Sequence, residues 1–189
     1  MKIRSFIALE IPDASLTTII KIRDEKIGKD EDVRWEGKEK LHLTLKFLGD
    51  INSELIGAYS QTLEKIIGGY ESLNLSFSEF GVFKRRNEFK ILWIGLKNNQ
   101  KLIQIASEIE AAFAELGFEK EKREFKSHIT LLRFRGHEDS EKIVSKIVSL
   151  IEVKLPDIDF KANKITFYES MLTPSGSVYR SLKNFYLKN

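Results

Sequence analysis

The chain has 189 residues, of which 42% are hydrophobic and 31% charged, with a net charge of +3 and no cysteine. This composition suits one folded domain with a buried core and argues against a disordered chain. The lack of cysteine excludes disulfides, thiolate nucleophiles and zinc–thiolate sites, and the small net charge argues against a dedicated duplex binder while permitting a local basic patch.

The first apolar stretch of the chain, between Arg4 and Glu10, is too short for a signal peptide or a membrane span. We therefore expect a cytoplasmic protein that does not enter a membrane.

Hydrophobic periodicity and turn residues predict strands and helices along the whole chain. The predicted strands cover about 4–11, 33–35, 41–48, 73–83, 89–96, 125–134, 159–172 and 178–187. The predicted helices cover about 13–27, 53–68, 99–116 and 140–151. Asp13 is the expected N-cap of the first helix and Gly28 its stop. Short turns at 84–87 and 173–176 favour antiparallel hairpins.

The two parts of the chain, roughly 1–86 and 87–189, share the order strand, helix, strand, helix, strand. Their sequences agree locally, because HLTLKFLGDINSE from His42 aligns with HITLLRFRGHEDSE from His128. We therefore expect a single domain over 1–189 with a bilobal α+β fold. Its two lobes would be related by an approximate two-fold axis, each with an antiparallel sheet and outer helices, with a cleft between them. Exchange of strands between the lobes is left open.

Each copy of the repeat places His, an aliphatic residue, Thr and Leu on a predicted strand. Because side chains alternate along a strand, His42 and Thr44 should share one face, as should His128 and Thr130. One such tetrapeptide is most often an ordinary half-buried strand. Chance, however, would place x-Thr-Leu after a given histidine only roughly once in 200 tries. Two of the three histidines carry it, so the pattern indicates a functional site.

Two histidines facing one cleft suit a displacement at phosphorus. One neutral imidazole can take a proton from the nucleophile, while a protonated one gives a proton to the leaving oxygen. Threonine hydroxyls can donate hydrogen bonds to phosphate oxygens. The chain has no HExxH motif, no His and carboxylate cluster near either motif and no GxSxG motif. We therefore expect neither a metal nor another cofactor, and no serine-hydrolase mechanism.

Four segments carry a resemblance to a known family: RSFIALEIP at the start, HLTLKFLG, FKSHITLLRF, and ESMLTPSGSVYRSL near the end. On these, the chain resembles the two-histidine phosphoesterases, specifically the LigT-like RNA 2′,3′-cyclic phosphodiesterases, also called 2′-5′ RNA ligases. Ser127 departs from the proline usual before the second histidine. The resemblance implies a bilobal fold and hydrolysis of a 2′,3′-cyclic phosphate to a 2′-phosphate. Some relatives also join or cleave 2′-5′ linkages.

The resemblance also implies roles for motif residues. Thr44 and Thr130 would hold the phosphate, His128 would activate water as the base, and His42 would protonate O3′ as the acid, although this division stays open. Arg133 matches a phosphate-binding arginine of the relatives. In a regular strand Arg133 would face away from His128, so it could serve only if the strand bends or ends there.

Other residues are weaker candidates. Lys46 shares the strand parity of His42 and could play the same electrostatic role. His137 lacks the motif and is interpreted as a solvated loop residue. The basic turn at 84–86 fits either an RNA contact or a solvated hairpin tip. Tyr168 and Tyr179 are interpreted as packing residues.

The leading hypothesis is therefore a monomeric, metal-independent hydrolase that acts on RNA ends or cyclic nucleotides. The alternative is a non-catalytic module that binds RNA or a nucleotide in the same cleft. The sequence leaves open the physiological substrate and the extent of any ligase activity.

Overall fold

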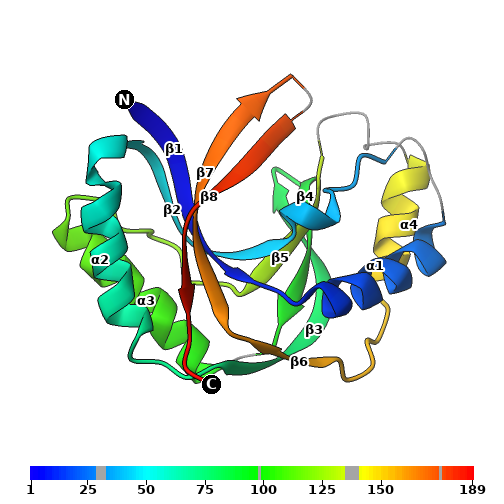
Figure 1. Ribbon diagram of the computed structural model, residues 1–189. Helices are drawn as coiled ribbons and strands as arrows, with labels where there is room; N and C mark the ends of the chain where they lie inside the picture. The colour runs from blue at the N-terminus through cyan, green and yellow to red at the C-terminus, as the bar shows by residue number, and fades with distance from the viewer. Residues whose placement is uncertain (29–32, 98, 135–140, 175) are drawn as a thin grey trace.

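The computed structural model describes residues 1–28, 33–97, 99–134, 141–174 and 176–189. In this part of the chain, antiparallel strands form one strongly curved sheet with helices on its outside (Figure 1). The strands are β1 (Lys2–Glu10), β2 (His42–Asn52), β3 (Leu73–Arg85), β4 (Glu88–Leu96), β5 (His128–Arg133), β6 (Asp159–Ala162), β7 (Lys164–Thr173) and β8 (Gly176–Tyr186). The α-helices are α1 (Asp13–Ile27), α2 (Ile56–Ile67), α3 (Gln100–Glu115) and α4 (Glu141–Ile151), with 3-10 turns at Lys38–Lys40 and Ser53–Leu55.

Over the described residues, the sheet consists of two four-stranded halves. Its strand order is β6-β3-β4-β5-β2-β1-β7-β8. The halves meet where β2 lies beside β5, and a single residue pair, Leu43 with Ile129, is in register there. Both side chains are fully buried. The expected α+β fold with antiparallel pairing and outer helices is confirmed.

The helices cover the two halves in pairs. Helices α2 and α3 pack together outside the half that contains β1 and β2, while α1 and α4 pack together outside the half that contains β3 (Figure 1). We call the opposite face of each half its inner face. Helix α1 follows β1 directly in the chain, yet it packs beside the other half, so the chain crosses over after its first strand.

Some local predictions were wrong. Residues 159–172 are not one strand, because β6 pairs with β3 and β7 pairs with β1, and the chain passes between the halves at Asn163. Residues 33–35 form only an isolated bridge from Trp35 to Leu132. Asp13 is the first helical residue rather than a side-chain cap, and its carboxylate accepts a hydrogen bond of 2.5 Å from Lys38. Gly28 ends α1 with a φ of +76°, as expected.

Both motif strands carry a β-bulge at the same position. On β2, the pair Ile7–Lys46 is followed by Ala8–Thr44, which leaves Leu45 unpaired. On β5, the pair Leu92–Leu132 is followed by Trp93–Thr130, which leaves Leu131 unpaired. An extra residue in one strand reverses the face of every side chain beyond it.

The inner face beside β5 depends on a close approach at a glycine. The Trp93 ring lies so near the Gly81 backbone that a Cβ built at Gly81 would come within 2.3 Å of a ring carbon. Trp93 is itself only 3% exposed. The glycine therefore provides the space that the indole occupies.

We expect Gly81→Ala to lower the free energy of unfolding by about 1–3 kcal/mol, because the added methyl group overpacks against Trp93. Gly57→Ala is the matched control. A Cβ at Gly57 meets nothing within 4 Å, so alanine in α2 should raise stability by about 0.5–1 kcal/mol. Urea unfolding of the two variants tests both signs, and equal effects would refute the packing argument.

Candidate active site

The two motif histidines lie on either side of the residue pair that joins the sheet halves. His42 is the first residue of β2 and His128 the first of β5, and each immediately precedes a member of the Leu43–Ile129 pair. Because the strands are antiparallel, their motif residues converge around this pair. A charge on His128 accordingly affects the pKa of His42. The structure thus brings together the two histidines that the sequence singled out.

Each imidazole is held by the backbone carbonyl two residues before it. His128 Nδ1 lies 2.7 Å from the carbonyl oxygen of Lys126, and the His42 ring is hydrogen-bonded to the backbone of Lys40. A carbonyl can only accept, so Nδ1 of His128 must be the protonated nitrogen. Its Nε2 is then left with a free lone pair for proton transfer.

Aromatic rings support both imidazoles. His42 stacks on Phe6 with centroids 4.8 Å apart, and the edge of Tyr179 lies 5.3 Å away. His128 meets Phe83 edge to face at 4.9 Å, with Trp93 at 6.5 Å. These contacts restrict ring rotation, so each imidazole is pre-oriented before a ligand enters.

Burial makes both histidines neutral near pH 7. It lowers the pKa of His42 to about 4, with a further lowering by Arg133 that the Lys40 hydrogen bond and the charge of Glu10 only partly offset. Burial likewise lowers the pKa of His128, and the nearby charges of Arg133 and Lys126 add to this effect. An imidazole that is hard to protonate in an empty site can be protonated when an anion arrives.

A carboxylate network lies beside His42. Glu10, the registered partner of His42, accepts hydrogen bonds from Tyr168 and, at 2.7 Å, from Thr166. Lys164 is 3.4 Å from the same oxygen. Burial raises the pKa of Glu10, but these partners outweigh it and hold the pKa below its ordinary value. Glu10 therefore stays ionised and favours the protonated form of His42.

The bulges decide which cations reach the inner face. Beyond Leu131, Arg133 turns to the side of His128, and its charge lowers the pKa of both histidines. It also lies 3.5 Å from a carboxylate oxygen of Glu36.

Lys46 turns the other way and is 5% exposed, with its ammonium 2.7 Å from Glu110 of α3. The expectation that Lys46 shares the face of His42 was therefore wrong.

The two motif threonines are half-buried. Of the residues that the structure describes, none forms a hydrogen bond with the hydroxyl of Thr44 or Thr130, so both hydroxyls are available to a ligand. His137 lies outside the described residues. The basic turn at 84–86 is the tip of the β3–β4 hairpin, where Arg86 has a left-handed φ of 51°.

Sequence reasoning missed several residues of this site. Phe6, Glu10, Glu36 and Lys126 received no role, and Tyr168 and Tyr179 were assigned only to packing. One signal was present, since Glu10 is the charged residue that ends an apolar strand. The others depend on which strands become neighbours, which the sequence pattern does not reveal.

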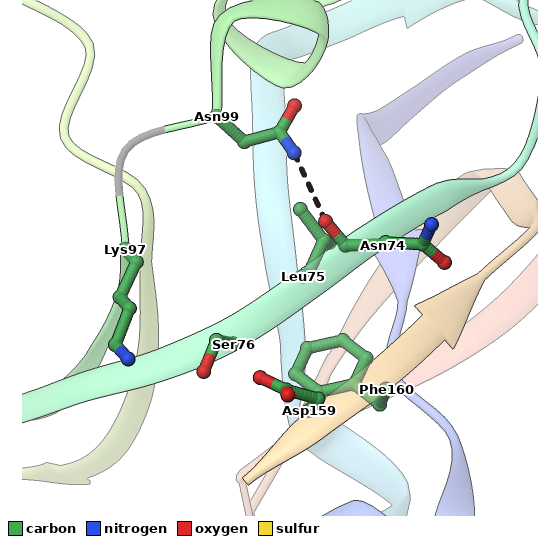
Figure 2. Close-up of a pocket in the computed structure, with 7 residues that line it drawn as sticks. All are labelled: Asn74, Leu75, Ser76, Lys97, Asn99, Asp159 and Phe160. Atoms are coloured by element: carbon green, nitrogen blue, oxygen red, sulfur yellow. Dashed lines mark hydrogen bonds between the residues drawn. The ribbon is translucent and has the colours of Figure 1, made fainter. Parts of the chain in front are cut away.

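Hollows lined by described residues lie at two places beside the sheet. One, of about 400 Å³, reaches His42 and is lined also by Glu10, Lys38, Lys164 and Tyr168. The other, of about 500 Å³, lies where β3 pairs with β6 (Figure 2). The residues that line it are distant in the sequence from both motifs. There, Asn99 donates a hydrogen bond of 3.0 Å to the carbonyl of Asn74. The larger hollow contains no histidine, and the smaller one is lined by His42 but not by His128.

The described residues include no group of three or more His, Asp or Glu side chains placed to hold a metal ion. In the same residues, no helix is both long and apolar enough to cross a membrane.

Comparison with known proteins identifies the family. The family model of the 2′-5′ RNA ligase superfamily matches residues 11–171. An RNA 2′,3′-cyclic phosphodiesterase of Methanocaldococcus jannaschii is 31% identical, with 96% of this chain and 99% of the relative covered. A protein of the same name from Methanothermobacter thermautotrophicus is 26% identical, with coverage of 99% and 100%.

Solved structures agree with this result. Escherichia coli LigT complexed with 3′-AMP has a TM-score of 0.76 at 25% identity, with both chains fully covered. TT0787 of Thermus thermophilus shares the fold with a TM-score of 0.79 at 19% identity and 98% coverage of each chain. The paired motifs, the fold and the relatives lead to one conclusion: this chain belongs to the 2′-5′ RNA ligase superfamily.

Proposed function

We propose that this protein is an RNA 2′,3′-cyclic phosphodiesterase that hydrolyses a terminal cyclic phosphate to a 2′-phosphate without a metal. The observation that carries the proposal is the pair of imidazoles set on either side of one joining residue pair, each held by the carbonyl two residues before it. The names of the relatives, which span nearly the whole chain, support the same activity.

In the proposed reaction, His128 removes a proton from water as the water oxygen attacks phosphorus. The bond from phosphorus to O3′ breaks, and His42 delivers its proton to O3′. Thr44 and Thr130 donate hydrogen bonds to the non-bridging oxygens, and Arg133 balances their charge. The product carries the phosphate on O2′, and the two histidines have exchanged protonation states.

Fixed charges support this division of roles. The Glu10 carboxylate favours protonated His42, whereas the Lys126 ammonium disfavours protonated His128. The low pKa of His42 means that the acid is uncharged in the free protein at pH 7. The anionic phosphate must therefore raise that pKa on binding, so the substrate helps to create its own acid.

A binding module without turnover is the competing function. It would not need two titratable imidazoles, each hydrogen-bonded to the backbone two residues before it. Because one chain supplies both motifs, we also propose that the protein acts as a monomer. Its activity per protein molecule should then not depend on protein concentration.

We expect His42→Ala and His128→Ala each to lower kcat by about 10²–10⁴-fold, because each removes one proton-transfer group. The double variant should lose little more, since both act on one transition state. The assay is hydrolysis of a 2′,3′-cyclic nucleotide, with circular dichroism to check folding. His137→Ala is the control and should match wild type. Near-full activity in either single variant would contradict the assignment.

The pH profile should reflect the lowered histidine pKa values. Since both lie below the ordinary value of about 6.5 in the free protein, kcat/KM should be bell-shaped, with its alkaline limb below that pH. The alkaline limb of the kcat profile should lie at higher pH than that of kcat/KM, because bound phosphate favours the charged imidazole. Neither limb is assigned to a single histidine, because the two histidines titrate as a coupled pair. A rate that rises steadily from pH 5 to 9 would contradict an acid–base pair.

Replacing Arg133 should change that profile in a known direction. Its positive charge lowers both histidine pKa values, so Arg133→Gln should move the alkaline limb of the kcat/KM profile to higher pH. The substitution should also raise KM. The control is Arg123→Gln, which removes an exposed arginine paired with Glu121. An unchanged profile with unchanged KM would remove Arg133 from the site.

Hydrolysis should persist in excess EDTA. The expectation follows from a cysteine-free chain with three histidines and no recognisable metal-binding motif. Loss of turnover in chelator, restored by an added divalent ion, would refute the metal-independent mechanism. Binding of the cyclic nucleotide without any turnover, with or without metal, would instead favour the binding module.

A further inference from the structure

We propose that Phe47 and Arg4 form a subsite for an unpaired base of the RNA, next to the nucleotide that bears the cyclic phosphate. The subsite rests on the proposed function, because the cyclic phosphate is what fixes the RNA end at the two histidines. It predicts that an oligonucleotide end is a better substrate than a mononucleotide.

Phe47 lies on the same face as the catalytic pair. It is the registered partner of Phe6, and Phe6 stacks on His42. Arg4 is two residues before Phe6 on β1, a distance of about 7 Å along a strand. Arg4 and Phe47 are thus continuous with the inner face that holds His42, within the reach of one neighbouring nucleotide.

The exposure of Phe47 results from strand irregularities on both sides of it. The register of β2 slips at Leu45 and again at Leu48, beside Gly49 with its left-handed φ of +69°. In a regular strand, Phe47 would face α3 and the core, as Lys46 does here. Instead Phe47 is 51% exposed. The bulges therefore move a large aromatic ring out of the core and onto the inner face.

Arg4 adds an unpaired cation to this ring. Its guanidinium lies 4.8 Å from the Phe47 centroid. Asp50 is its registered neighbour, yet no ion pair joins them. Among the described residues, Arg4 forms no hydrogen bond or carboxylate contact. An exposed aromatic ring beside a guanidinium that has no carboxylate partner is the combination that stacks a base and attracts the adjoining phosphate.

The test compares two substrates, 2′,3′-cyclic AMP and a trinucleotide that ends in a 2′,3′-cyclic phosphate. Wild type should have the higher kcat/KM for the trinucleotide. Phe47→Ala should reduce the trinucleotide-to-mononucleotide ratio by about 5- to 150-fold, the value of one stacked base. Phe47→Tyr, which keeps the aromatic face, should restore the ratio. Arg4→Gln should lower the ratio. For trinucleotide binding, it should also make the slope of log K against log salt concentration shallower by about 0.7.

Ile103→Ala is the matched control, since it removes an exposed apolar side chain from α3 on the outer side and should leave the ratio unchanged. Equal kcat/KM for both substrates in wild type, or an equal loss for both in Phe47→Ala, would overturn the subsite while the proposed function stands. If wild type hydrolyses neither substrate, the proposed function fails. Fluorescence anisotropy of a labelled trinucleotide then decides the subsite, and equal affinity of wild type and Phe47→Ala would refute it.

Discussion

The contact between Leu43 and Ile129 is the constraint on which the rest of the molecule depends. Among the described residues it is the only registered pair between β2 and β5, and its burial fixes the two sheet halves against each other. The motif residues on either side of it are brought together as a consequence. A single pair anchors the halves and still leaves their polar side chains free to meet a ligand.

The surroundings of the two histidines disfavour a protonated imidazole. Two half-buried imidazoles lie near the positive charge of Arg133, whose guanidinium is 3.5 Å from a carboxylate oxygen of Glu36. Such an arrangement disfavours every protonated histidine until an anion enters. In the proposed function, the same charges that lower the histidine pKa values would favour phosphate binding. Selectivity for anions and control of protonation would then arise from one set of groups.

Much of this could be predicted from the sequence, because periodicity and a repeated motif are local properties. His42, His128 and the fold class followed from them. The bulges at Leu45 and Leu131 could not, since a bulge depends on the partner strand, and they decide that Lys46 faces α3 while Arg133 faces the histidines. The break at Asn163 was missed for the same reason: continuous strand propensity does not show that a segment changes its neighbour. The aromatic support of His42 likewise comes from strands distant in the chain.

The strand order also determines when this protein can become active during its synthesis. Strand β1 is made first, but its second neighbour, β7, begins only at Lys164. Until then, one edge of β1 has exposed main-chain groups, and the tyrosine partners of Phe6 and His42 do not yet exist. Such long sequence separations slow folding and leave an open edge on the nascent chain. Both motifs are synthesised before β7 and β8, yet the surroundings of His42 are completed only by these last strands.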